Sequence, residues 1–449
     1  MSNRQLLSEL NKGKSRHIIK NRIKYAKLLL ENNKLENIID FDNKDDKNFL
    51  SKDSDSDASY DTRISLKKKE HDIKNVVRSI GGELKYVKSG TTGHTFRGVD
   101  MDSDGKPLYE YAVKVVPLPK KDKYGDTFDT RRPENAELVM IKLLSSFVIR
   151  EKTPHIVLPI GTFDTDIQIF TTLIKDGWIE KKHKSYDKYK DFIRRYKEGE
   201  FYDNVSVLIS EWADGGDLSS FIRENYKTMT TIEWKVIFFQ LISTLAVIQT
   251  EYPYFRHNDL KANNILVSKI HIPTKKTPKI YTIAGNKYNV TNTGYQIKLW
   301  DFDFACIPNI VDNKKVLTSC KWTKKLNVGF EQNRYYDLHY FFNTLIRKDG
   351  GFFSGLMTSD YITNEVKQFI LSIVPDDLQK GSCIAENGRI LNNIEYVIPA
   401  DVLIKNPFFD EFRCTKTDVD IIKNNDNNVY INNFLLSSPE KKIKKTKKQ

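Results

Sequence analysis

The segment HNDLKANNIL, which spans residues 257–266, carries polar residues whose types and spacing suit phosphoryl transfer. Asp259 can accept or orient the proton of an attacking hydroxyl, and Lys261 can neutralise charge that builds on the transferred phosphoryl group. Asn264, and Asp301 in LWDFDFA 37 residues later, offer the hard oxygen ligands that magnesium prefers. An isolated His-x-Asp is more simply a buried polar turn, but the complete spacing predicts a catalytic loop.

A second group of residues, upstream, predicts a site for nucleotide phosphates. Lys114 in YAVKVV lies within an apolar strand, where a buried ammonium group is costly unless an opposite charge receives it. A nucleotide phosphate or Glu137 on the following helix can supply that charge, with Glu134 as the fallback; otherwise the lysine points outward from an edge strand. One strand earlier, SGTTGHTFRG contains a turn whose backbone can approach phosphates closely. The candidate residues of this turn are Gly90, Thr91, Thr92 and Gly93.

The segment SEWADGGDLSSF has the composition of a link between a strand and a helix. Backbone groups from Glu211 to Ala213 can bond the edge of an adenine ring. Asp217 can bond a ribose hydroxyl or cap the helix that begins at Leu218. We therefore assign Glu211, Ala213 and Asp217 to the expected nucleotide site.

The order of the predicted elements indicates an α+β protein with two parts. Strands are predicted at 81–99, 108–119, 205–212, 280–290 and 294–302, and helices at 133–149 and 232–249. The second of these helices is apolar on most sides, so we expect it to be buried. The region after residue 335 reads as mainly helical. Strands that precede helices in this way favour two packed layers of different type.

Composition limits the cellular setting. The 449 residues carry a net charge of +13, but six of these charges are lysines of the C-terminal KKIKKTKKQ, which leaves +7 elsewhere and weakens the case for a nucleic-acid binder. We find neither a run of about 18 apolar residues nor the apolar core of a signal peptide. The four cysteines lack CxxC spacing, which argues against a disulfide scaffold or zinc site. We expect a soluble, intracellular protein.

Taken in order, the glycine-rich turn, AVK, the helix glutamate, EWADGGDL, HNDLKANN and DF resemble the signature set of eukaryotic-type protein kinases, over roughly residues 80–345. More narrowly, WDFDFA, NRYYDLHYFFNTL and PADVLIKNPFF resemble the divergent serine/threonine kinases of poxviruses and other large DNA viruses. The resemblance implies an α+β, bilobal protein-kinase-like fold with a small β-rich N-lobe and a larger helical C-lobe. It also implies ATP and Mg²⁺ as cofactors, protein substrates, and a location in a virion or the host cytoplasm.

The chain departs from the kinase pattern at several positions. Lys88 stands where the first glycine of the loop would be, and Asp303 replaces the glycine after Asp-Phe. Asn258 replaces the arginine that normally reads a phosphorylated activation loop, so such control is not expected. No Ala-Pro-Glu follows, which puts the usual peptide platform of residues 304–334 in doubt. Asp337 in YYDLHYFF is expected to bond the backbone of the catalytic loop.

Composition divides the chain into four segments. We expect an N-terminal accessory, partly disordered arm, an N-lobe and a C-lobe with one insertion each, and a basic tail. The arm should contain one amphipathic helix, with Ile19, Ile23, Ala26 and Leu30 at helical spacing. The segments are 1–77, 78–214 with an insertion at 175–203, 215–435 with an insertion at 268–296, and 436–449.

The insertions and the tail leave alternatives open. The first insertion is either a solvated amphipathic helix or a surface for nucleic acid or another partner, and the second is expected to form a β-hairpin. The tail is either a nuclear signal, a membrane-surface patch, an RNA contact or a solubilising extension.

Three functions compete on this evidence. The leading hypothesis is phosphorylation of serine or threonine on proteins, because Lys261 two residues after the catalytic aspartate is typical of protein acceptors. HNDL with an acidic Asp-Phe turn also resembles small-molecule kinases of the choline or aminoglycoside type. A catalytically silent kinase fold that acts as a scaffold is the third reading, favoured slightly by the missing glycine at 88 and the absent Ala-Pro-Glu.

Overall fold

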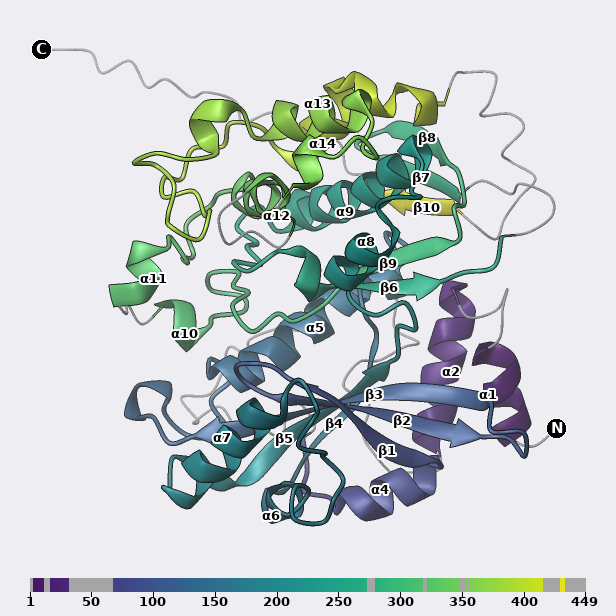
Figure 1. Cartoon of the computed structure of the whole chain (residues 1–449), viewed down its shortest axis with the longest axis vertical. Helices are drawn as coiled ribbons and strands as arrows, with labels where there is room; N and C mark the ends of the chain where they lie inside the picture. The colour runs from purple at the N-terminus through teal and green to yellow at the C-terminus, as the bar shows by residue number, and fades with distance from the viewer. Residues whose placement is uncertain are drawn as a thin grey trace, which may run out of the picture.

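The computed structural model describes most of the chain, and Figure 1 shows how its elements are arranged. The Ser/Asp-rich stretch 40–62 of the N-terminal arm, which is the part expected to be disordered, and the basic tail 436–449 lie outside the described residues. The described residues are 3–11, 17–31, 68–272, 279–317, 321–347, 353, 355–414 and 429–432.

An antiparallel sheet of five strands forms the first part of the fold, here called the sheet region. Its order is β1-β2-β3-β5-β4. The strands are β1 (Glu83–Ser89), β2 (His94–Met101), β3 (Pro107–Pro119), β4 (Pro159–Asp166) and β5 (Phe201–Glu211). Helix α5 (Pro133–Ile149) follows β3 with the predicted bounds, begins with a proline in its first turn, and contacts β4. In Figure 1 the sheet region occupies the lower half of the molecule.

The second part of the fold, the helical region, lies above the sheet region in Figure 1. Its longer helices are α8 (Leu218–Asn225), α9 (Thr231–Glu251), α12 (Tyr336–Ile346), α13 (Asn364–Ile373) and α14 (Pro399–Lys405). Helix α9 is long and apolar enough to cross a membrane, but 83% of its apolar window is buried inside the fold, as in a core helix. Thr230 and Glu233 form a capping box at its start. The predicted order of strands followed by helices is confirmed.

Further short strands and helices lie outside the five-stranded sheet and the longer helices. Strands β6 (Ile265–Lys269) and β9 (Tyr295–Leu299) pair with each other, and β7 (Lys279–Ile283) forms a hairpin with β8 (Asn286–Val290), as expected for the second insertion. Strand β10 (Val429–Asn432) pairs with β7. The remaining short helices are α6 (Gln168–Thr171), α10 (Lys314–Leu317) and α11 (Lys321–Lys325).

The N-terminal arm packs against the sheet region. Helix α2 (Ile19–Glu31) corresponds to the predicted amphipathic helix, whereas α1 (Asn3–Asn11) was not predicted. Figure 1 shows both helices side by side at one end of the sheet, and they contact β3, β4 and α5. Helix α4 (Ile73–Ile80) spans the boundary expected at residues 77–78.

The first insertion forms the amphipathic helix α7 (Tyr186–Lys197). Its two buried residues, Tyr189 and Phe192, lie with their ring centroids 4.5 Å from that of His94 on β2. The polar face of the helix carries exposed charges, which pair within the insertion, for example Arg194 with Asp191. The insertion therefore packs its apolar face onto the hairpin that carries the glycine-rich turn.

Candidate active site

Lys114 is the centre of a buried group of charges between the two parts of the fold. Its Nζ lies 2.5 Å from a carboxylate oxygen of Glu137 on α5 and 2.9 Å from Asp301. Glu134, the fallback partner, pairs instead with Arg132 at 3.3 Å. The lysine therefore points inward and satisfies its charge with two carboxylates, which compensates the cost of burial.

These three charges shift one another's protonation. Burial alone would lower the pKa of Lys114, but the carboxylates of Asp301 and Glu137 raise it above the ordinary value for lysine. Burial raises the pKa of Glu137, and Lys114 opposes this shift. Desolvation would also raise the pKa of Asp301, but Lys114 lowers it below the ordinary value for aspartate. Both shifts favour the charged form of Lys114 and of Asp301, whose side chain is 36% exposed.

Asp259, Lys261 and Asn264 form a second group on the loop that follows α9. The Nζ of Lys261 lies 2.8 Å from Asp259 Oδ2, and Asn264 Nδ2 donates to the same oxygen at 2.9 Å. Asn264 Nδ2 also donates to the backbone carbonyl of Asp259 at 2.9 Å. Lys261 and Asn264, which were predicted from residue type and spacing, therefore both contact the Asp259 carboxylate directly.

Asp337 on α12 stabilises the backbone of this loop. Its carboxylate accepts hydrogen bonds from the backbone N–H of His257, at 2.7 Å, and of Asn258, at 2.9 Å. This confirms the role predicted for Asp337. Asn258 has a φ of 63°, a left-handed conformation that asparagine tolerates better than most residues.

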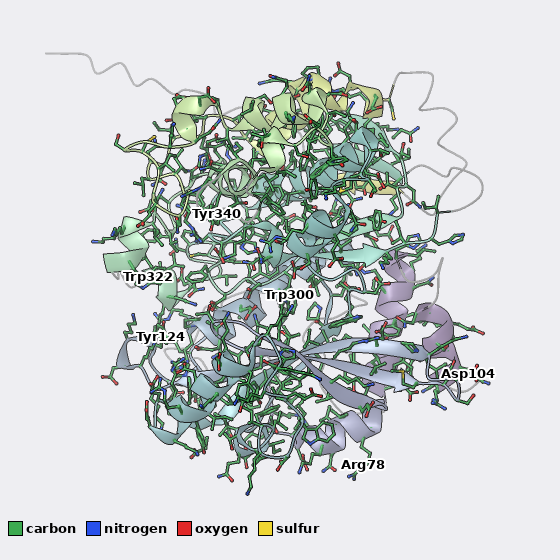
Figure 2. The ribbon with its side chains drawn as sticks, viewed as in Figure 1. Arg78, Asp104, Tyr124, Trp300, Trp322 and Tyr340 are labelled. Atoms are coloured by element: carbon green, nitrogen blue, oxygen red, sulfur yellow. The ribbon has the colours of Figure 1, made fainter. Side chains whose placement is uncertain are left out.

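One backbone contact joins the two groups. The N–H of Trp300 donates to the carbonyl of Asn264 at 3.1 Å, so Asn264 lies beside the residue that precedes Asp301. Figure 2 shows Trp300 at the junction of the sheet region and the helical region. Asp301 also has a φ of 63°. A carboxylate and an amide oxygen from these neighbouring segments form the kind of hard donor set that fits Mg²⁺.

The predicted glycine-rich turn connects β1 to β2. Gly90 N–H donates to the carbonyl of Gly93 at 2.8 Å, and a Cβ added to Gly93 would lie 2.7 Å from the backbone oxygen of Val115. Thr95, just after the turn, pairs in register with Lys114 on β3. The turn borders a cavity of about 620 Å³. Among its lining residues are Gly90, Thr91, Thr92, Gly93, Glu134, Asp303 and Lys315.

The link between β5 and α8 closes the same side of the junction. Ala213 is buried, and Asp217 accepts a hydrogen bond from Ser220 N–H at 3.0 Å, which makes it the N-cap of α8. Lys88 on β1 lies 3.8 Å from the Asp217 carboxylate. An isolated bridge pairs Asp217 with Leu266, two residues after Asn264. The link therefore lies between the glycine-rich hairpin and the catalytic loop.

The side chain of Glu211, at the start of this link, binds the N-terminal arm. Arg22 on α2 donates to both of its carboxylate oxygens, at 3.0 and 2.5 Å, and Lys298 lies 2.8 Å away. Leu158 N–H also donates to Glu211, at 2.8 Å. Burial alone would raise the pKa of Glu211, but Arg22 and Lys298 lower it to about 2. Because the side chain has these partners, only the backbone groups of Glu211 are available to bond a nucleotide.

Asn258 connects the two ends of the segment that follows Asp301. Its Nδ2 donates to the carbonyl of Phe304 at 3.0 Å and to that of Gly329 at 2.9 Å. Gly329 N–H donates back to Asn258 Oδ1 at 3.3 Å. A neutral amide therefore occupies the position where the kinase pattern has an arginine.

Two lysines stabilise the beginning of that segment. Lys314 lies 2.7 Å from Asp129, in the connection between β3 and α5, and so ties the segment to the sheet region. Lys315 pairs with Asp303, the residue that replaces glycine after Asp-Phe. Asp303 therefore carries its own cation next to the candidate metal ligand Asp301.

Sequence reasoning missed three basic residues that contact the predicted site. Arg22 and Lys298 bind Glu211, and Arg389 binds the carboxylate of Asp259. Arg389 lies 130 residues from Asp259 in a stretch without a kinase motif. Because the contacts arise only from chain folding, neither spacing nor residue type marks these residues in advance.

Comparison with known proteins defines the class of the chain. Residues 186–412 match the family model described as "Poxvirus serine/threonine protein kinase". The "Putative serine/threonine-protein kinase R400" of Acanthamoeba polyphaga mimivirus is 44% identical over 88% of this chain and 80% of its own length. "Serine/threonine-protein kinase 2" of Swinepox virus (strain Kasza) is 39% identical over 25% of this chain and 23% of its own length.

These matches place the chain among the protein kinases, a class that uses ATP. The chain belongs to the poxvirus-type serine/threonine protein kinase family, as the resemblance of its motifs predicted. A second mimivirus relative, the "Putative serine/threonine-protein kinase R301", is 26% identical over 59% of this chain and 70% of its own length.

Proposed function

We propose that the chain adopts the two-lobed protein kinase arrangement and transfers the terminal phosphoryl group of ATP to serine or threonine hydroxyls of proteins. The observation that carries this proposal is the joining of two polar groups at the junction of the sheet and helical regions. Lys114, Glu137 and Asp301 form one group, and Asp259 and its partners form the other. Phosphoryl transfer depends mainly on such positioning and charge neutralisation.

Each group has a separate task in the proposed reaction. Asp259 accepts or orients the proton of the attacking hydroxyl, and Lys261, which contacts it, neutralises charge on the transferred group. Lys114 contacts nucleotide phosphates while Glu137 holds its ammonium group in position. Asn264 and Asp301 would hold Mg²⁺, which neutralises charge on the phosphates when it is bound.

The remaining predicted residues would bind ATP. Backbone amides of Thr91, Thr92 and Gly93 face the phosphates in this proposal, while Gly90 N–H donates to the Gly93 carbonyl and keeps the turn closed. The backbone from Glu211 to Ala213 bonds the adenine edge, and Asp217 bonds the ribose in addition to capping α8. The basic Lys88 beside Asp217 stands where a glycine is usual, at the mouth of this site.

Neither competing reading is favoured by a specific observation. A silent scaffold would not need four separate charged or polar residues to meet in contact distance, as Lys114, Asp301, Asp259 and Asn264 do within their two groups. A small-molecule kinase would not need Lys261 at Asp259.

Mass spectrometry after incubation with ATP and Mg²⁺ tests the proposal. The purified chain and a panel of generic protein substrates should gain phosphate on serine or threonine. Asp259→Asn should abolish transfer while ATP still produces a thermal shift, about 2.7 kcal/mol at 100 times the dissociation constant. Asp401→Asn, which changes a surface pair with Lys405 in the same isosteric way, is the matched control.

The outcomes separate the three readings. Transfer to choline-like alcohols alone would support a small-molecule kinase. A thermal shift without any transfer would support the scaffold. Modification of tyrosine alone would contradict the proposed acceptor class.

The named relatives are viral proteins, so we propose a viral origin and action in the virion or the host cytoplasm. The basic tail 436–449, with a proposed nucleic-acid or membrane contact, lies outside the described residues. Immunoblots of purified particles against infected-cell extract would test the location. Absence of the chain from both the purified particles and the infected-cell extract would exclude the proposed location.

A further inference from the structure

Arg389 lies on a tight hairpin far from the catalytic loop in sequence. Ile384 and Ile390 form a bridge, and Ala385 N–H donates to the carbonyl of Arg389 at 2.7 Å. Asn343 on α12 donates to the carbonyl of Gly388 at 2.8 Å. The backbone immediately before Arg389 is therefore attached to the same helix that carries Asp337.

The guanidinium group of Arg389 is buried and directed at the catalytic loop. Its Nη2 binds Asp259 Oδ1, and its Nε and Nη2 each donate to the carbonyl of Asn258 at 3.4 Å. Its Cζ lies 4.0 Å from the ring centroid of Tyr340, which Figure 2 shows in the helical region. The residue is 7% exposed. Stacking and burial leave the side chain little freedom.

The two oxygens of Asp259 consequently have different partners. Oδ1 binds Arg389, whereas Oδ2 receives Lys261 and Asn264. A carboxylate bound on both oxygens cannot rotate about its Cβ–Cγ bond without breaking a charge-assisted contact. Lys261 and Asn264 belong to the loop itself, but Arg389 ties the carboxylate to the rigid α12 side.

We propose that Arg389 is a positioning residue for phosphoryl transfer, which orients the carboxylate of Asp259 toward the acceptor hydroxyl. This inference rests on the proposed function, because orientation matters only if Asp259 takes part in transfer. When a reacting group is displaced by a fraction of its contact distance, kcat falls much more than the affinity for substrate does.

Chemical rescue of Arg389→Ala is the test. Truncation should lower kcat on the order of 10- to 100-fold and leave KM for ATP within about twofold. Guanidinium chloride, well below unfolding concentrations, should restore part of kcat, whereas urea, a neutral molecule of similar shape, should not. Arg389→Lys, which keeps the charge, should retain more kcat than Arg389→Ala and also serves if the alanine variant does not fold.

Arg347→Ala is the matched control, because Arg347 donates to the carbonyl of Glu386 in the same hairpin. Its kcat should stay near that of the wild type. A double-mutant cycle of Arg389→Ala with Asp259→Asn, read by thermal unfolding, should be non-additive and reports the contact without any activity.

Specific outcomes overturn the inference. The inference is contradicted if Arg389→Ala has a kcat equal to or above that of the wild type. It is also contradicted if guanidinium chloride does not restore kcat and Arg389→Lys retains no more kcat than Arg389→Ala. A fall in kcat equal to that of Arg347→Ala would contradict it as well. If the wild-type chain transfers no phosphate, the proposed function fails and this inference fails with it; if only the Arg389 variants behave like wild type, this inference fails alone.

Discussion

Replacement of Arg22 by methionine should release the N-terminal arm. The Arg22 side chain is 1% exposed and forms a fork with both oxygens of Glu211. Its other donors reach the carbonyls of Pro154 and Ile156, each at 2.7 Å. Methionine keeps much of the apolar stem but removes every one of these contacts.

The expected cost follows from what remains after the change. Loss of one partner of a buried ion pair costs about 3–5 kcal/mol, but Lys298 still lies 2.8 Å from Glu211 and reduces that figure. Two buried carbonyls lose donors, at about 1 kcal/mol each. We therefore expect α2 to open about 3 kcal/mol more easily, which is on the order of 100-fold less protection from amide exchange.

Hydrogen exchange of the α2 amides measures this opening directly, with the amides of α13 as an internal reference. Arg4→Met is the matched control in the same arm, because Arg4 pairs with Asp100 while its side chain is 58% exposed. Because solvent screens that exposed pair, amide exchange of α2 in Arg4→Met should stay near that of the wild type. If α2 in Arg22→Met exchanges within about threefold of wild type, the buried fork does not hold the arm.

Three further predictions concern neighbouring contacts. The pKa of Glu211 in the folded chain is about 2, below its ordinary value of 4.5, so ionised Glu211 stabilises the docked α2 fully above pH 4.5. Protection of the α2 amides from exchange should therefore be lost as the pH falls from 4.5 toward 2. Asn258→Ala leaves the carbonyls it binds without donors, so proteolysis within residues 304–334 should accelerate, with a cost of about 2–3 kcal/mol; unchanged cleavage would contradict this role. Gly93→Ala should lower the free energy of urea unfolding by about 1–3 kcal/mol, because its Cβ would lie 2.7 Å from the Val115 oxygen; an unchanged midpoint would show that β3 yields freely.

The candidate site was accessible to sequence reasoning wherever its members lie close along the chain or follow a regular element. Asp259, Lys261 and Asn264 span six residues, so their order restricts how they can meet. The role of Asp337 was predicted from the resemblance of its motif to protein kinases, and its carboxylate does accept a hydrogen bond from the loop backbone. The helices α5 and α9 were equally clear, because long apolar stretches have few alternatives to burial.

The contacts that sequence reasoning missed are those between distant segments. The sequence predicted a nucleotide contact for the backbone around Glu211 but gave no partner for its side chain, which binds Arg22. The capping role of Asp217 was decided only by the position of α8. Helix α1 was missed because its nine residues carry little apolar signal of their own. In the fold it packs against α2 and β3, and tertiary packing of this kind supplies most of the stability of a short helix.

The sequence by itself determined which chemical groups are present, their local spacing and the alternation that separates strands from helices, since these depend on near neighbours along the chain. Tertiary structure alone decided that Arg389 contacts Asp259 and that Arg22 contacts Glu211. It also decided that Lys114 pairs with Asp301 as well as with the predicted Glu137. The physical reason is that a buried charge accepts whichever opposite charge the packing of apolar surfaces brings within reach. That packing is a property of the whole fold and not of any single segment.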